Sequence, residues 1–214
     1  MKKNILTLLV LLSSFSFVYA QKTISEGTIC YAIQIKNSAK QTNVDSATST
    51  IYLKGGSVRT DMINSLGNET TIYDSKAGNA TILKQYSGQK LMITLTKENW
   101  DKKFARYNGI VFKPTAEVKT IAGYKCKKAI AQLSDSTSFS VYYTSELNVF
   151  NKDYDPIFKS LPGLPIQYEF ERGPLLFSYT LSSLDQSPVP AAKFEIPKSG
   201  YRVMTYDESQ QKKN

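Results

Sequence analysis

One stretch decides the fold class, and it is Glu117-Val-Lys-Thr-Ile-Ala-Gly-Tyr-Lys-Cys-Lys-Lys-Ala-Ile-Ala-Gln-Leu-Ser-Asp-Ser-Thr-Ser-Phe-Ser-Val-Tyr-Tyr-Thr144. It contains three short runs of β-type residues, which are separated by Ala122-Gly123 and by Ser134-Asp135-Ser136. Short β-type runs with turn residues between them predict an antiparallel meander. In the third run, apolar and aromatic residues alternate with serine, so one face of that strand is apolar.

The same pattern extends over most of the chain. Further strands are predicted at 27–36, 50–54, 58–63, 70–73, 80–85, 90–95, 166–171 and 175–184. Gly55-Gly56 lies between two of them and is a strong hairpin signal, because glycine tolerates positive φ. The polar segment 37–49 is expected to be a long loop, and Ser160-Leu-Pro-Gly-Leu-Pro165 a rigid turn. We therefore predict a mainly β (α+β) domain with about ten strands.

One segment has helical periodicity instead. Residues 97–107 carry aromatic side chains at spacings of four and three, which places them on one face of a helix: Trp100, Phe104 and Tyr107. Thr96 precedes the segment as a suitable N-cap. A single helix cannot form a complete second layer over so many strands. We expect the sheet to curl on itself and to cover its concave face with this helix.

Residues 1–20 have the features of a cleaved signal peptide. Lys2 and Lys3 precede an apolar run, and Val18-Tyr19-Ala20 fits a signal-peptidase site. The apolar run is shorter than a membrane-spanning helix requires. We expect the mature chain to begin at Gln21 and to be soluble outside the cytoplasm, either periplasmic or secreted.

The remaining chain is expected to form one domain over residues 21–205, followed by a frayed polar tail at 206–214. The full sequence has a formal net charge of +9, of which the signal peptide carries two. A secreted basic protein rarely meets nucleic acid, so we expect no nucleic-acid partner, and the charge favours an anionic membrane surface. A plainer interpretation is that the lysines keep a β-rich surface soluble and protect strand edges.

The sequence contains no histidine, which removes the commonest general base and the commonest metal ligand. With only two cysteines as further soft ligands, we expect no metal site and no cofactor. An enzyme would have to work with carboxylates, lysine, tyrosine or serine alone, and it ranks third behind two non-enzymatic interpretations, so we expect no enzymatic activity. Asp153 and Asp155 are spaced like part of a calcium loop. The glycine and the closing glutamate of such a loop do not follow at the required positions, so this signal is weak.

Cys30 and Cys126 are the two cysteines. An even number of cysteines in an oxidising compartment predicts a disulfide bond between them. The alternative is that each is a small core residue, because free cysteine packs like a hydrophobic side chain. A bond requires the two strands to be adjacent, with Cα atoms less than about 7 Å apart.

Aromatic residues are abundant, with 14 tyrosines, 10 phenylalanines and one tryptophan. A curled sheet with sparse cover often leaves a ligand cavity, although these residues could equally form a filled core. If there is a cavity, the alternation predicts that its walls and lid include Ile51, Leu53, Met62, Leu91, Ile93, Trp100, Phe104, Val141, Tyr143 and Phe177.

The segment Thr120-Ile-Ala-Gly-Tyr-Lys-Cys-Lys-Lys-Ala129 resembles a motif in a family of small secreted proteins from Gram-negative bacteria, the domain of unknown function 4412 family. Further similar segments are Ile51-Tyr-Leu-Lys-Gly-Gly-Ser-Val-Arg-Thr60, Ile72-Tyr-Asp-Ser-Lys-Ala-Gly78 and Phe194-Glu-Ile-Pro-Lys-Ser-Gly-Tyr201. Leu161-Pro-Gly-Leu-Pro165 resembles the Gly-Leu-Pro-Gly-Leu-Ile signature of a related group, from which it departs at both ends.

That family looks like a branch of the lipoprotein-carrier superfamily of the LolA and LolB type. The resemblance implies a strongly curved antiparallel half-barrel whose open, apolar side is closed by one to three helices. It also implies a partner, namely a lipid or the acyl chain of a lipoprotein. We expect a monomeric periplasmic carrier or sensor of a lipid-like apolar ligand. The alternative is an envelope interaction or scaffold protein whose concave face is filled and binds no ligand.

Overall fold

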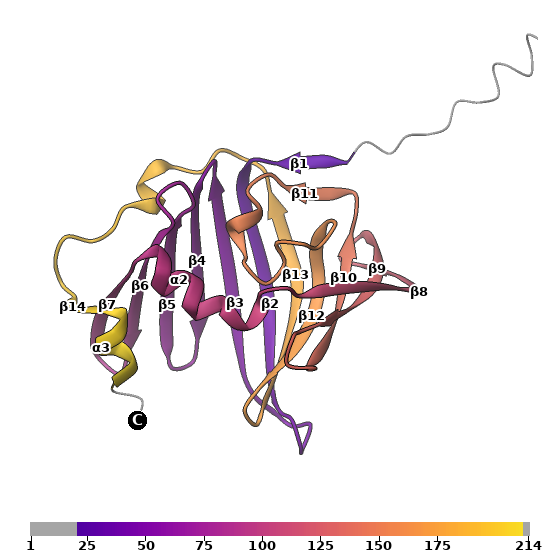
Figure 1. Ribbon diagram of the computed structural model, residues 1–214, viewed down its shortest axis with the longest axis horizontal. Helices are drawn as coiled ribbons and strands as arrows, with labels where there is room; N and C mark the ends of the chain where they lie inside the picture. The colour runs from indigo at the N-terminus through magenta and orange to yellow at the C-terminus, as the bar shows by residue number, and fades with distance from the viewer. Residues whose placement is uncertain (1–20, 212–214) are drawn as a thin grey trace, which may run out of the picture.

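The protein is described by a computed structural model of residues 21–211, and the expected signal peptide at 1–20 lies outside the described residues. One large, open and curved sheet dominates the structure (Figure 1). Its strand order is β14-β7-β6-β5-β4-β3-β2-β13-β12-β10-β9-β8. Neighbouring strands are antiparallel throughout, except that β14 runs parallel to β7. The expected mainly β, curved architecture is confirmed, and the sheet does not close into a barrel.

The number of strands is larger than the ten expected. The first half of the large sheet contains β2 (Glu26–Asn37), β3 (Asn43–Lys54), β4 (Ser57–Asn64), β5 (Gly67–Asp74), β6 (Asn79–Tyr86) and β7 (Gln89–Leu95). The second half contains β8 (Val111–Ile121), β9 (Tyr124–Gln132), β10 (Ser138–Thr144), β12 (Leu164–Arg172) and β13 (Leu175–Asp185). The short strand β14 (Arg202–Thr205) forms the edge of the first half, beside β7. A separate parallel pair is formed by β1 (Lys22–Ile24) and β11 (Leu147–Val149).

Helical segments are few and short: α2 (Lys97–Phe104), the 3₁₀ turns η1 (Ala105–Tyr107), η2 (Lys152–Tyr154) and η3 (Ala191–Phe194), and α3 (Tyr206–Gln211). The predicted helix over 97–107 is thus confirmed as α2 continued by η1. Thr96 caps it as expected: its side chain accepts a hydrogen bond from the Asn99 amide, and the Asn99 side chain accepts one from the Thr96 amide. This reciprocal pair satisfies two amides that the first helical turn leaves free.

Two segments expected to be irregular are ordered elements. The predicted loop at 37–49 is mostly strand, because β3 begins at Asn43 and pairs with β2. Small residues still alternate there, with Ala47 and Ser49 buried on the inner face. At the other end, Tyr206–Gln211 forms α3 instead of a frayed tail. Thr205 and Glu208 cap its start reciprocally, in the same way as Thr96 and Asn99 cap α2.

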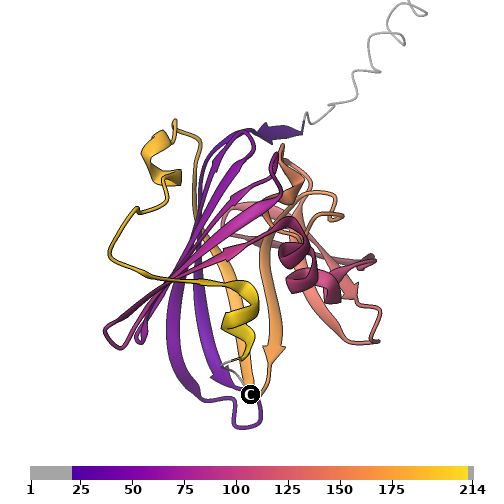
Figure 2. The same ribbon diagram turned by 60° about the vertical axis from the view of Figure 1, so that its left-hand side comes forward.

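The two faces of the sheet are covered by different parts of the chain (Figure 2). On the concave face lie α2 with η1, and the segment 147–163. The convex face of β4 to β7 is crossed by the C-terminal segment before β14. There the Lys193 ammonium lies 4.8 Å from the ring centre of Tyr52, and Tyr201 packs on a small apolar cluster. The main core therefore lies on the concave side.

The turn before β12 depends on one glycine. Gly163 has a φ of +157°, and a Cβ atom at this position would lie 2.1 Å from the carbonyl oxygen of Thr144. Only glycine allows the chain to pass so close to β10. The predicted turn at 160–165 is confirmed in part, because the chain bends at Pro162 and Gly163 but Leu164 and Pro165 already belong to β12. The close approach at Gly163 is the physical reason for the bend.

The predicted Cys30–Cys126 disulfide is wrong for this structure, in which both cysteines are free. Cys30 lies in β2 and Cys126 in β9, and three strands (β13, β12 and β10) separate them in the sheet. At about 4.8 Å per strand spacing, the two Cα atoms cannot approach within the roughly 7 Å that a bond requires. The alternative interpretation holds for Cys126, which is fully buried among core residues.

Candidate functional site

A cavity of about 430 Å³ lies between the concave face of the sheet and its cover. Its floor is formed by β3, β4, β5, β12 and β13, and its cover by α2, η1 and the segment 154–157. The residues that line it are Ser49, Ile51, Val58, Thr60, Met62, Glu69, Thr71, Tyr73, Trp100, Lys103, Phe104, Arg106, Tyr107, Tyr154, Asp155, Pro156, Ile157, Tyr168, Phe170, Glu171, Arg172 and Tyr179. This volume falls within the usual range for small-molecule sites.

Aromatic rings form two facing groups in this cavity. In one group, Trp100 of the cover stacks on Tyr73 of the floor strand β5 with 4.6 Å between ring centres, and it contacts Phe104 at 4.7 Å. In the floor, Tyr168 and Tyr179 stack at 4.6 Å. Such stacked rings supply a large apolar area of fixed shape. The cavity is therefore suited to an apolar or flat molecular surface.

The structure places the ten predicted cavity residues in three environments. Ile51, Met62, Trp100 and Phe104 line the cavity as expected. A second group points to the same concave side but is buried in packed core: Leu53, Ile93, Val141 and Tyr143. The remaining two, Leu91 and Phe177, are half-buried, and Phe177 packs against that core. Whether any of the ten contacts a ligand stays a prediction.

Sequence reasoning missed the floor tyrosines and the cover segment. Tyr168 and Tyr179 stand on predicted strands with the correct alternation, and they could have been found from it. Tyr154 and Asp155 lie in a segment where periodicity carries no information about facing. The Asp153–Asp155 spacing drew attention to this segment for calcium binding. Among residues 21–211, no group of three or more His, Cys, Asp and Glu side chains is arranged to hold a metal ion.

Charged groups surround the cavity unevenly. Lys103, Arg106 and Arg172 line it but are exposed at its rim. Glu69 is half-buried and forms an ion pair with Lys84 at 2.8 Å. Asp155 differs from all of these because it is half-buried without an ion pair to any other residue of the described chain.

Burial has a clear effect on the acid–base chemistry of this wall. It raises the pKa of Asp155 to about 6, while a hydrogen bond from the Ile157 amide, 2.9 Å long, acts in the opposite direction. The pKa of Tyr154 is raised well above its ordinary value, mainly by burial and also by the charge of Asp155. Both groups therefore ionise less readily here than in water.

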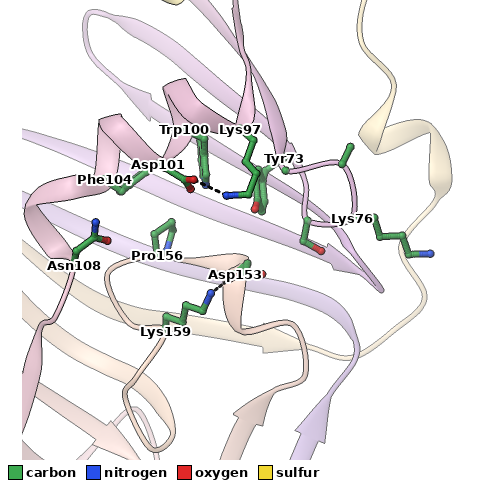
Figure 3. Close-up of a pocket in the computed structure, with 13 residues that line it drawn as sticks. Tyr73, Lys76, Lys97, Trp100, Asp101, Phe104, Asn108, Asp153, Pro156 and Lys159 are labelled. Carbon is green, nitrogen blue, oxygen red and sulfur yellow. Dashed lines mark hydrogen bonds and ion pairs between the residues drawn. The ribbon is translucent and has the colours of Figure 1, made fainter.

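A smaller cavity of about 270 Å³ lies on the other side of Trp100 (Figure 3). It shares four lining residues with the larger cavity: Tyr73, Trp100, Phe104 and Pro156. Two ion pairs face each other across it, Lys97–Asp101 at 2.5 Å and Lys159–Asp153 at 2.6 Å (Figure 3). Trp100 and Phe104 thus lie between the larger cavity, which has aromatic rings in its walls, and the smaller cavity, which has two ion pairs in its walls.

The far end of the concave face is filled. Phe158, only 2% exposed, projects from the cover segment and packs against Phe112, Phe139 and Tyr168. This packing occupies the concave side of β8 to β10. The concave face is consequently hollow under α2 and solid under the segment 157–161.

No helix within residues 21–211 is long and apolar enough to cross a membrane.

No family model matches the chain, and no curated protein matches it, so its resemblance to the domain of unknown function 4412 family is not confirmed. Among solved structures, the chain is similar to PNGF-II in its C2 crystal form, at 17% identity and a TM-score of 0.47 over 87% of this chain. It spans 32% of the PNGF-II chain. It is also similar to an uncharacterized conserved protein from Thermus thermophilus, at 9% identity and a TM-score of 0.47, covering 82% of this chain and 90% of that one. A third similar structure is the LolA superfamily protein NE2245 from Nitrosomonas europaea, at 8% identity and a TM-score of 0.34, covering 82% and 92%. All three TM-scores are below 0.5, and nothing about the function of this chain follows from them.

Proposed function

We propose that the protein is a non-enzymatic carrier or sensor of a lipid-like apolar ligand, which acts outside the cytoplasm. The observation that supports this is the 430 Å³ cavity under α2, with aromatic rings in both its floor and its cover. A solid core would have filled this space, as Phe158 does at the other end of the same face.

The energetics favour an acyl or alkyl chain as the ligand. Each methylene removed from water contributes about 0.8 kcal/mol. A chain of a dozen methylenes therefore gains roughly 10 kcal/mol before the costs of ordering and association. Micromolar affinity corresponds to about 8 kcal/mol, so it is within reach without a specific polar contact.

The test is a titration of the protein with dodecan-1-ol below its aggregation limit, followed by Trp100 fluorescence. Trp100 is the only tryptophan in the sequence and lines the cavity, so occupancy should change its emission. A Trp100→Phe variant with an extrinsic lipid probe separates binding from quenching. Native mass spectrometry of protein purified from the periplasm should show an apolar adduct.

A matched pair of variants locates the binding site. Thr60 lines the cavity, and Thr60→Phe should fill it and abolish binding. Thr48 is exposed and alternates with the inward-facing Ala47 and Ser49, so Thr48→Phe should leave binding unchanged. If the emission does not move up to the solubility limit of the alcohol and no adduct co-purifies, the carrier proposal fails. The scaffold alternative is then the better account.

A further inference from the structure

Two neighbouring residues that line the cavity carry polar groups with few or no hydrogen-bond partners. Tyr154 is 7% exposed, and its hydroxyl is the one buried side-chain nitrogen or oxygen atom within residues 21–211 that has no hydrogen-bond partner. The next residue, Asp155, accepts a single hydrogen bond, from the Ile157 amide, and forms no ion pair within the described chain. Both residues line the cavity.

This arrangement costs stability in the empty protein. A buried polar group without a hydrogen bond costs about 1–3 kcal/mol, and a charged one costs more. A protein that only needed a filled core would carry apolar residues at these positions. Partnerless groups in a cavity wall are instead what a polar ligand group would satisfy.

The surroundings of Asp155 select the kind of ligand group. Tyrosines from five elements are close enough for its charge to raise their pKa values: Tyr31 of β2, Tyr107 of η1, Tyr154 of η2, Tyr168 of β12 and Tyr179 of β13. Three cationic side chains line the cavity, and all three are exposed at its rim. Arg172 lowers the pKa values of Tyr107 and Tyr179 through its charge, Arg106 is ion-paired with Asp135 at 3.0 Å, and the Lys103 ammonium lies 5.6 Å from the ring centre of Phe104.

We propose, building on the proposed function, that the ligand is a long-chain amine whose ammonium group is held by the Asp155 carboxylate among the tyrosine rings. An ammonium group offers three hydrogen-bond donors and no acceptor, which matches an ionised carboxylate that accepts only one hydrogen bond, from the Ile157 amide. Aromatic rings attract a cation over their faces, which adds to the binding of the charge. A carboxylate or phosphate head would meet the like charge of Asp155 instead.

The test compares three probes with the same chain of twelve carbons, all below their aggregation limits: dodecylamine, dodecan-1-ol and dodecanoate. At pH 7.5 the amine should bind about tenfold or more tightly than the alcohol, because hydrogen bonds to charged groups are the stronger ones. Dodecanoate should bind most weakly. Asp155→Asn keeps the side-chain oxygen that accepts from Ile157, and it should reduce amine affinity to that of the alcohol while alcohol affinity stays the same.

Glu195→Gln is the matched control, since Glu195 is an exposed carboxylate that lines neither cavity. It should leave the preference for the amine unchanged. Lowering the pH from 7.5 to 5 protonates Asp155 and should remove the preference in the wild type, with no parallel change for the alcohol. Equal binding of all three probes, or tighter binding of dodecanoate, overturns the amine proposal but leaves the carrier function standing. If no probe binds, the proposed function itself fails.

Discussion

Asp155 should affect the free energy of unfolding of the protein as well as its binding of ligand. Its ordinary pKa is 3.8, and burial raises the value in the folded protein to about 6. Between these values the folded state binds more protons than the unfolded state, so stability falls as the pH rises. The stabilisation that Asp155 gives by binding a proton in the folded state is fully present below about pH 4 and is lost as the pH rises through 6.

We therefore predict that Asp155→Asn makes the protein more stable at pH 7.5, by about 3 kcal/mol, since the pKa shift is about two units and each unit corresponds to about 1.4 kcal/mol. The variant should also lose the fall in stability between pH 4 and 6. Urea unfolding of both proteins at several pH values measures the two effects. Asp153→Asn is a suitable control, because Asp153 is ion-paired with Lys159 and its loss should give no gain. If the variant is less stable than the wild type at pH 7.5, burial of the Asp155 carboxylate does not destabilise the folded protein.

Single residues also show why the sequence predicted the cavity only in part. Ile51 and Met62 were placed correctly, because period-two alternation fixes which face a strand residue occupies. Val141 and Tyr143 occupy the correct face but lie in solid core. Alternation cannot tell a hollow part of a face from a filled part, because that depends on which distant segment packs over it.

At the scale of elements, α2 is a short helix that holds the cavity cover in place. It has eight residues, which is too few to be stable alone in water, so it depends on its cap and on Trp100 packing against Tyr73. We predict that Thr96→Ala lowers the free energy of unfolding by about 1 kcal/mol, the usual effect of losing an N-cap. Dodecan-1-ol affinity should fall as well, because α2 carries two of the rings that cover the cavity.

Thr96→Ser is the conservative control, since serine keeps the oxygen that accepts from the Asn99 amide. It should restore both stability and affinity. Denaturant unfolding and the fluorescence titration provide the two measurements. If Thr96→Ala binds the alcohol as tightly as the wild type, the helix is not the cover of the binding site.

An element could be predicted from the sequence where its signal lies within the element itself. Helical spacing and the Thr96 cap lie within a dozen residues, so α2 with η1 was predicted at its correct position. The polar start of β3 has no local strand signal, and its conformation comes from pairing with β2. The disulfide prediction failed for a related reason. The separation of β2 and β9 is set by the return of β12 and β13 between them, which follows from the order of all the strands.

At the scale of the whole molecule, the concave face is divided into a solid end and a hollow end. The solid end provides a rigid support, because its rings contact one another directly. The hollow end keeps rings at its boundary but lacks side chains in its centre. A carrier needs both, since the energy released by core packing must compensate for the apolar surface that an empty cavity leaves unfilled.

Because one end is solid and the other hollow, a Phe→Ala substitution should change stability and ligand affinity differently at the two ends. Phe158 is 2% exposed at the solid end, and Phe158→Ala should cost about 3–5 kcal/mol of stability through lost burial and a new void. Phe104 is half-buried and lines both cavities, so Phe104→Ala removes fewer packed contacts and should cost about 1 kcal/mol. The affinity for dodecan-1-ol should fall more in Phe104→Ala than in Phe158→Ala, which is the opposite of the order for stability. Urea unfolding and fluorescence titration of both variants measure the two orders. If the two substitutions cost the same stability and neither weakens binding, the concave face is solid throughout, and the protein has no room for a ligand under α2.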